Sequence, residues 1–174
     1  MNRSFFATRL TLVMLFVCLT LVVQAQNQND RKSPPAKTSA KVNGVSISVD
    51  YSQPSKRGRL IWGGVVKYGK VWRTGANETT IFKLSASARI NGELLKEGKY
   101  SLFTIPNKDK WTIIFNSAPP QWGAYTYDES KDVLRVDVTP SYDNPSVEKF
   151  IIDIDDDGNV ILKWDDAIVS FKVS

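Results

Sequence analysis

Short stretches in which apolar and polar residues alternate recur along the chain from residue 45 to its C-terminus. The clearest reads VSISVDY and places Val45, Ile47, Val49 and Tyr51 on one face of an extended strand. Further strands are expected at residues 79–84, 88–90, 99–105, 110–115, 133–138, 150–154, 160–164 and 167–173. No apolar period of 3.6 residues persists over a dozen positions, so the pattern predicts an all-β protein.

Turn signals separate these segments. Asn91-Gly92 is a strong hairpin signal, and residues 106–109 (PNKD) and 155–159 (DDDGN) are expected to close two further hairpins. Nine or so short strands at this spacing predict a single-domain antiparallel β-sandwich, jelly-roll-like or Ig-like, with a partly closed barrel as the alternative.

The N-terminal part of the chain is expected to lie outside this domain. Arg3 and Arg9 precede an apolar run over residues 10–23, and Ala25 ends a site that signal peptidase would read. We therefore expect a signal peptide over residues 1–25, a flexible polar leader over 26–41 and the β-sandwich domain over 42–174. The protein would be exported, periplasmic or secreted, with no transmembrane segment after cleavage.

Composition excludes several kinds of chemistry. Cys18 would leave with the signal peptide, and the chain has no histidine. Disulfides, zinc sites of thiolate or imidazole, and Ser-His-Asp or Cys-His catalysis are then impossible. We expect no metal and no cofactor. Without Arg3 and Arg9, 21 basic residues face 18 acidic ones, a net charge of +3, which does not indicate a nucleic-acid partner.

Residues 53–78 differ from the rest of the chain. They hold five of the ten glycines, two of the five tryptophans, and six basic residues against one acidic residue. Apolar residues such as Ile61 and Trp62 should keep this stretch ordered, and its glycines indicate turns or close backbone approach. The C-terminal residues 150–174 are acidic by contrast, with six acids against two bases.

The candidate site residues come from this stretch and from an aromatic loop over residues 116–127. No residue is singled out as catalytic. Nine residues are expected to contact a ligand: Arg57, Arg59, Trp62, Arg73, Thr74, Asn77, Glu78, Trp122 and Tyr125. Two structural alternatives stay open. Arg73 and Glu78 could form an internal ion pair, and the loop aromatics could simply cover the end of the sandwich.

Residues 153–158, DIDDDG, match the opening of a calcium-binding loop. The twelfth position is Trp164 instead of a bidentate glutamate, and the flanks are strand-like. A polar hairpin turn is the favoured interpretation, with a weak adventitious Ca²⁺ site as the alternative.

Several motifs together resemble a bacterial family called domain of unknown function 2911. They are YSQPS at 51–55, KRGR at 56–59, IWGG at 61–64, YGKVWRTGANE at 68–78, YSLFTIP at 100–106, Trp111, QWGAY at 121–125 and DVLRV at 132–136. The resemblance covers residues 41–173 and implies an exported protein, mostly of Gram-negative bacteria. It implies no catalytic residue, since the family's activity is unknown.

Three hypotheses for the function follow. The first is a non-enzymatic envelope or periplasmic binding or interaction module, whose partner is a cell-envelope glycan, another anionic ligand or another envelope protein. The second is a carboxylate-dependent hydrolase such as a glycosidase, with Glu78 paired to Asp128, Glu129 or Asp132. The third is a purely structural domain in which residues 53–78 seal one edge of the sandwich.

Overall fold

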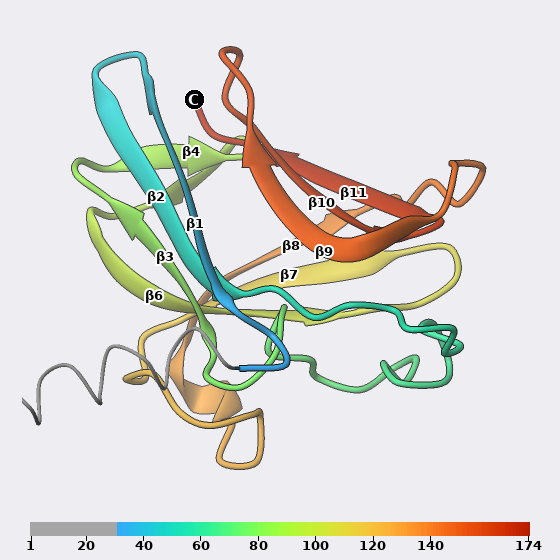
Figure 1. Ribbon diagram of the computed structural model, residues 1–174. Coiled ribbons are helices and arrows are strands. Elements are labelled where there is room, and N and C mark those ends of the chain that lie inside the picture. Colours follow the sequence, from blue (N-terminus) through green and yellow to red (C-terminus); the bar gives the residue numbers. More distant parts are fainter. Residues whose placement is uncertain (1–30) are drawn as a thin grey trace, which may run out of the picture. The chain divides into compact units, whose positions relative to one another are not determined.

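The computed structural model describes residues 31–174, whose arrangement is shown in Figure 1. The chain divides into two units, Met1–Pro34 and Pro35–Ser174, and the strands found in the described residues lie in the second. The predicted signal peptide over residues 1–25 lies outside the described residues, as do the first residues of the predicted leader. In the described part of the chain, no helix is long and apolar enough to cross a membrane.

Six antiparallel strands form the larger sheet, in the order β1-β2-β3-β6-β7-β8 (Figure 1). Their bounds are β1 (Pro35–Val42), β2 (Val45–Ser52), β3 (Thr80–Leu84), β6 (Gly98–Ile105), β7 (Trp111–Asn116) and β8 (Asp132–Val138). Each strand pairs with its neighbour in sequence, except that a hairpin is inserted between β3 and β6. Ile47, Val49 and Tyr51 of β2 are buried on one face, as their alternation predicts.

A smaller sheet faces the larger one across the core (Figure 1). It contains β9 (Val147–Ile154), β10 (Asn159–Asp165) and β11 (Ala167–Lys172), in the order β11-β10-β9. The inserted hairpin is β4 (Ala88–Ile90) and β5 (Glu93–Leu95), and it turns at Asn91-Gly92. The sheets are antiparallel and do not close into a barrel, so the predicted β-sandwich is confirmed.

The prediction of a flexible leader over residues 26–41 is wrong for residues 35–41. They form β1, which pairs with β2 along its whole length, from Pro35 opposite Ser52 to Val42 opposite Val45. An edge strand needs few large apolar residues, because its backbone hydrogen bonds to β2 hold it in place. Lysines on β1 also protect the exposed edge from pairing with other chains. The sandwich therefore begins at residue 35.

We call residues 53–78 the strap. Isolated bridges join it to three parts of the fold: Ser55 to Lys149 of β9, Trp72 to Thr104 of β6, and Glu78 to Trp122. The bridge at Thr104 has a clear reason. Since β3 begins only at Thr80, opposite Leu102, the end of β6 has no β3 neighbour there. Trp72 takes its place, with backbone N–O distances to Thr104 of 2.8 and 2.9 Å.

The strap contributes two tryptophans to the core. Trp62 and Trp72 lie with Trp111 of β7 and Trp164 of β10, so residues of the strap and both sheets meet in one cluster. We call these four residues the tryptophan cluster. The rings of Trp72 and Trp164 are stacked at 5.8 Å, and the rings of Trp62 and Trp111 meet edge to face at 4.8 Å. The predicted order of this stretch is thus explained by burial of its aromatic residues.

Replacing Trp72 should therefore destabilise the whole domain. The Trp72→Ala change removes a buried ring and its indole hydrogen bond to the Gly75 carbonyl. We expect a loss of about 3–5 kcal/mol in the free energy of unfolding, measured by urea denaturation. Trp122→Ala is the matched control, because Trp122 is 61% exposed, and it should cost about 0.5 kcal/mol or less. Equal losses for the two variants would contradict the packing described here.

Candidate functional site

A cavity of about 270 Å³ lies between the strap and the aromatic loop. We call it the Arg73 pocket. Its lining combines basic, apolar and aromatic side chains from the two segments: Val65, Val66, Lys67, Lys70, Val71, Trp72, Arg73, Ala124 and Tyr125. Two of the nine predicted site residues, Arg73 and Tyr125, therefore lie in the same cavity wall although 52 positions separate them.

The position of Arg73 is set by the turn that follows it. Thr74 adopts a φ of 55°, and its buried hydroxyl donates to Thr104 Oγ1 at 3.2 Å. Gly75 comes next, where an added Cβ would lie only 2.9 Å from the Ser52 carbonyl oxygen. The Trp72 indole N–H donates to the Gly75 carbonyl at 3.0 Å. Arg73 is thus held by a rigid turn whose anchor is the tryptophan cluster.

The Arg73 guanidinium is partly buried and has no counter-ion among the described residues. Its Nε is buried without a hydrogen-bond acceptor in this part of the chain. Burial lowers the pKa of the guanidinium, and the neighbouring Tyr125 phenol acts in the opposite direction. Between residues 31 and 174 no ion pair joins Arg73 to Glu78. Arg73 therefore carries a partly desolvated positive charge that an anionic ligand would stabilise.

Asn77 and Glu78 join the strap to the aromatic loop. Asn77 adopts a φ of 57°, and its carbonyl accepts the Gly123 N–H at 2.9 Å. Glu78 forms a backbone bridge with Trp122, and Thr79 donates to the Gln121 carbonyl. Both predicted site residues therefore position the loop that carries Trp122 and Tyr125.

The loop aromatics are exposed, with one exception. Trp122 is 61% exposed and Tyr125 is 87% exposed, so neither covers the end of the sandwich. Tyr127 is the exception, since its ring contacts the buried Phe103 at 5.0 Å. Aromatic faces that stay in solvent are available for stacking on a ligand.

The structure does not bring the remaining predicted residues to the Arg73 pocket. Trp62 is 8% exposed and lies in the tryptophan cluster. Arg59 folds back on the strap, where its guanidinium donates to the Ser55 and Lys56 carbonyls. The backbone N–H of Arg57 donates to Glu148 of β9. Trp62 thus packs in the core, and Arg59 stabilises the loop formed by residues 55–59.

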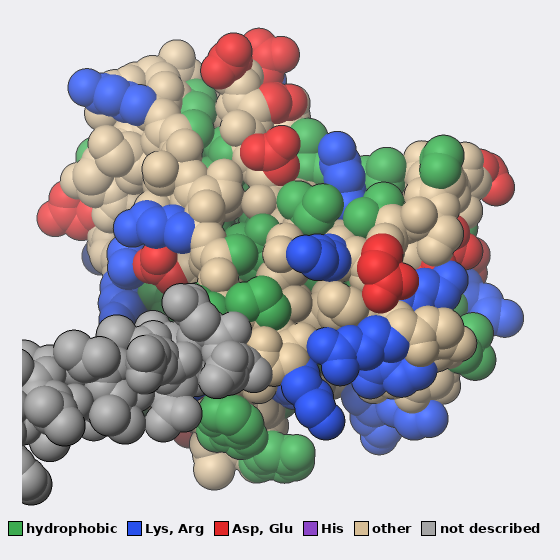
Figure 2. All heavy atoms as spheres, viewed as in Figure 1, with side chains coloured by type: hydrophobic (Ala, Val, Ile, Leu, Met, Phe, Trp, Pro, Cys, Tyr) green, Lys and Arg blue, Asp and Glu red, His purple; other side chains and the backbone are tan. Residues whose placement is uncertain are grey.

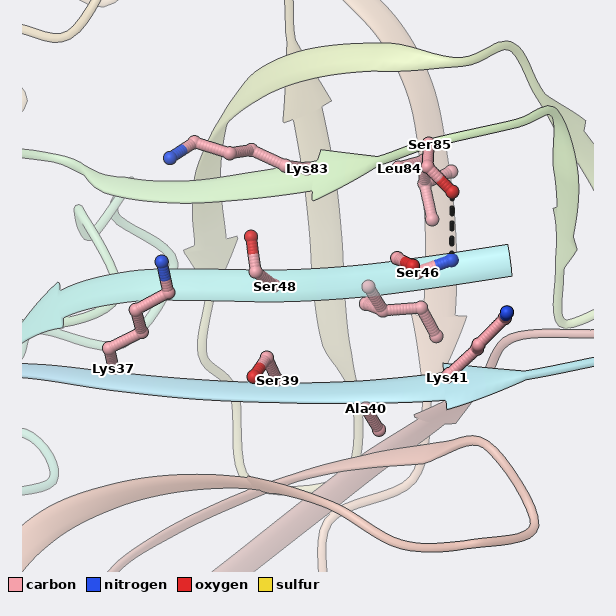
Figure 3. A pocket seen from close by; sticks show the side chains of 10 residues that line it. Lys37, Ser39, Ala40, Lys41, Ser46, Ser48, Lys83, Leu84 and Ser85 are labelled. Atoms are coloured by element: carbon pink, nitrogen blue, oxygen red, sulfur yellow. Dashed lines mark hydrogen bonds between the residues drawn. The ribbon is translucent and has the colours of Figure 1, made fainter. Parts of the chain in front are cut away.

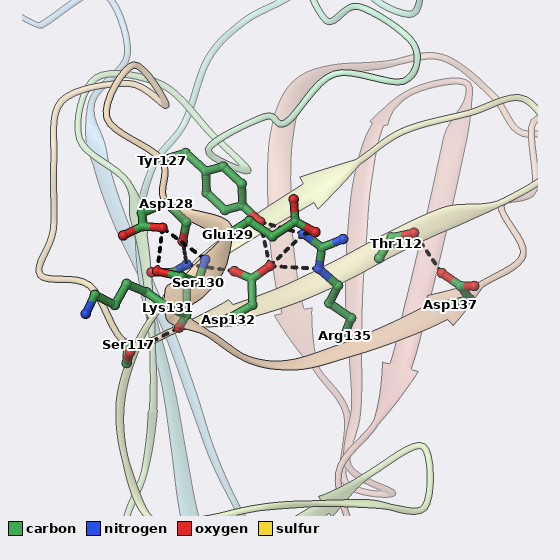
Figure 4. A network of polar contacts seen from close by, with 11 residues as sticks. Thr112, Ser117, Tyr127, Asp128, Glu129, Ser130, Lys131, Asp132, Arg135 and Asp137 are labelled. Atoms are coloured by element: carbon green, nitrogen blue, oxygen red, sulfur yellow. Dashed lines mark hydrogen bonds and ion pairs between the residues drawn. The ribbon is translucent and has the colours of Figure 1, made fainter.

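Figure 4 shows the acidic residues that the hydrolase hypothesis would pair with Glu78. Asp132 accepts hydrogen bonds from Tyr127 at 2.5 Å and from Arg135 Nε at 2.7 Å. It also accepts one from Asn116 at 2.7 Å. This network anchors the C-terminal end of the aromatic loop to β7 and β8.

The two other acids are also engaged in local contacts (Figure 4). Asp128 caps the 3-10 helix Glu129–Lys131 by accepting hydrogen bonds from the Ser130 hydroxyl and N–H, which lower its pKa. Glu129 forms an ion pair with Arg135 at 3.0 Å. Both carboxylates are therefore held by local contacts in the aromatic loop region.

A larger hollow, of about 570 Å³, lies against β1, β2 and β3 (Figure 3). Lysines and serines dominate its lining: Lys37, Lys41, Lys83, Ser39, Ser46, Ser48 and Ser85. Asp50 lies 2.5 Å from Lys83 and 3.6 Å from Lys37, so two of the three lysines of the hollow share one carboxylate. It contains no aromatic residue and none of the predicted site residues. We therefore take the smaller Arg73 pocket as the candidate site.

The calcium-like segment forms a hairpin turn between β9 and β10. Gly158 adopts a φ of 86°, and the Asp155 carboxylate accepts the backbone N–H and the side-chain amide of Asn159. These contacts confirm the turn interpretation. Within residues 31–174 no group of three or more acidic, histidine or cysteine residues could hold a metal ion.

The chain belongs to the family described as "Protein of unknown function (DUF2911)", whose model matches residues 33–173. This confirms the family indicated by the motifs. No curated protein and no solved structure matches the chain. The strap and the aromatic loop both lie inside the matched region.

The network around Asp132 has a pH dependence that can be measured. Burial and the hydrogen bond to Asp132 raise the pKa of Tyr127 from 10.0 to about 12. The protonated phenol therefore stabilises the fold below pH 10, and this contribution is lost as the pH rises through about 12.

We expect wild type to be more stable than Tyr127→Phe below pH 10, with a difference that shrinks between pH 10 and 12. Urea denaturation at a series of pH values measures both proteins, and titrations of other groups cancel in the comparison. A difference that stays constant or grows over this range would contradict the network.

Proposed function

We propose that this member of the DUF2911 family is a non-enzymatic binding module whose Arg73 pocket takes the carboxylate of an acidic saccharide. The observation that carries the proposal is the Arg73 guanidinium, which is partly buried, has no anion within the described residues and lines an open cavity. A protein that keeps a desolvated charge uncompensated bears a cost in stability, and a bound anion would remove that cost.

The chemistry of the pocket favours a carboxylate. A guanidinium presents its N–H groups in a planar fork that matches two carboxylate oxygens. Lys67 and Lys70 line the same cavity and add positive charge. The Lys67 ammonium donates to the Gly63 carbonyl, so its charge is not compensated there. An anion entering the cavity would therefore meet a guanidinium and two ammonium groups.

The rest of the pocket favours a sugar. Tyr125 lies at the pocket with most of its ring in solvent, and Val65, Val71 and Trp72 supply apolar wall. Sugar rings present C–H faces that stack on aromatic rings. The volume of about 270 Å³ lies just below the range of about 300–1,000 Å³ typical of small-molecule sites. A single acidic sugar residue, such as a uronic acid or a lactyl-bearing amino sugar, fits this description.

The cellular setting follows from the predicted signal peptide. An exported protein would meet the glycans of the cell envelope in the periplasm or outside the cell. Acidic sugars of that envelope are the ligands we propose. The structural roles of Asp128, Glu129 and Asp132 favour binding over hydrolysis.

Titration calorimetry with a uronic acid and with its neutral parent sugar tests the proposal. Wild type should bind the acid saturably and the neutral sugar much more weakly. Arg73→Gln should weaken binding of the acid by about 10- to 150-fold, which corresponds to the 1.5–3 kcal/mol of a charged hydrogen bond. Tyr125→Ala should weaken the binding of both sugars, because the change removes the aromatic ring on which a sugar would stack.

Arg89→Gln is the matched control for charge. Arg89 is exposed on β4 and donates to the Gly92 carbonyl within its own hairpin, so its loss should leave binding unchanged. Binding that is absent in wild type, or that is unaffected by Arg73→Gln, would overturn the proposal and favour a purely structural strap.

A further inference from the structure

We propose that the outer surface of the strap and the aromatic loop docks on an anionic phospholipid bilayer. Seven large apolar residues are exposed in the described part of the chain, and four of them lie on these two segments: Leu60, Val65, Trp122 and Tyr125. The other three, Leu94, Val133 and Ile151, lie on strands β5, β8 and β9. The inference goes beyond saccharide binding, because it concerns the surface around the pocket.

The apolar tip of the strap is rigid. Leu60 is 72% exposed and Val65 is 46% exposed, and the Val65 N–H donates to the Leu60 carbonyl at 3.0 Å. Beneath them, Ile61 is fully buried. Gly64 completes the turn, where an added Cβ would lie 2.1 Å from the Leu60 carbonyl oxygen. A rigid tip can present its side chains to a membrane without an added cost in chain entropy.

The exposed aromatics lie on the aromatic loop, which lines the Arg73 pocket together with the strap. Val65 and Tyr125 line the same cavity, which places the strap tip and the aromatic loop next to each other. Trp122 is joined to the end of the strap through its bridge with Glu78. Tryptophan and tyrosine are the side chains enriched at the boundary between lipid headgroups and acyl chains, while leucine and valine can insert further.

Positive charges lie on the same strap as Leu60 and Val65. Figure 2 shows Lys and Arg side chains gathered at the lower right of the molecule, over the region where Figure 1 places the strap. Arg59 and Lys67 contact backbone carbonyls, and within residues 31–174 no carboxylate compensates their charges. Lys56 differs, since it is paired with Asp165 at 2.5 Å. Basic side chains around an apolar tip are complementary to a surface of anionic headgroups.

This combination selects one partner. A soluble polyanion would satisfy the basic side chains but would leave Leu60 and Val65 in water. A neutral bilayer would take up the apolar residues without using the charges. An anionic bilayer satisfies both. The expected interaction is peripheral and reversible, because the apolar tip is small.

Vesicle binding tests the inference, and the protein contains its own probe. Four of the five tryptophans are buried, so Trp122 is the one whose fluorescence should respond to a membrane. The full-length gene is expressed, and the purified protein is mixed with two kinds of vesicle. One contains phosphatidylcholine alone, and the other contains phosphatidylcholine and phosphatidylglycerol. Every variant shares the same N-terminus, checked by mass spectrometry, so residues 1–30 contribute equally. No saccharide is present.

We expect binding to the phosphatidylglycerol vesicles, with a blue shift of tryptophan emission and with an affinity that falls as salt is added. Leu60→Ser should weaken binding by about fivefold or more, because the apolar side chain no longer leaves water. Leu94→Ser is the matched control. Leu94 is 60% exposed but lies on β5, so its replacement should leave vesicle binding unchanged.

Absence of binding to phosphatidylglycerol vesicles would overturn the inference, as would equal effects of Leu60→Ser and Leu94→Ser. Binding of soluble polyphosphate with the same affinity as the vesicles would also overturn it, in favour of a simple polyanion site. Leu60 does not line the Arg73 pocket, so Leu60→Ser should keep its affinity for the uronic acid. Failure of one proposal is therefore distinguishable from failure of the other.

Discussion

The insertion of Trp62 and Trp72 between the two sheets is the interaction on which the rest of the structure depends. The two rings meet Trp111 of the larger sheet and Trp164 of the smaller sheet, and each such aromatic contact adds about 0.5–1.5 kcal/mol beyond simple burial. The cluster therefore joins three parts of the fold at once. Without the cluster, residues 53–78 would be a long loop with too few buried contacts to hold one conformation.

The candidate site is a consequence of that anchorage. Trp72 replaces the missing β3 neighbour of β6, its indole holds the turn at Gly75, and Arg73 lies between these two constraints. The following residues then carry the aromatic loop, through the bridge between Glu78 and Trp122. A charge held in a partly buried position by rigid backbone is preorganised for a ligand, since little entropy is lost when the ligand binds.

Much of this architecture could be predicted from alternation and turn residues, because these report directly on burial and backbone conformation. Strand β1 could not, because its stability comes from pairing with β2 and its residues are mostly polar. For the strap, the sequence contained many candidate residues and did not distinguish their roles. Its glycines, tryptophans and charges all indicated importance, but only the folded chain separates Trp62, which is packed in the core, from Arg73, which lines a cavity. Pairing of Arg73 with Glu78 was equally reasonable from sequence, since spacing alone does not determine side-chain direction.

The strap holds the Arg73 guanidinium partly desolvated, and we propose that this charge binds an anion. Nitrogen-15 NMR of the arginine Nε–H groups detects this state, because the Arg73 Nε is a buried donor without an acceptor in the described chain. The Arg73 Nε proton should exchange with water more slowly than the Nε proton of the exposed Arg89, and its signal should shift when a uronic acid is added. Exchange at the rate of Arg89, with no shift on addition of the acid, would contradict it.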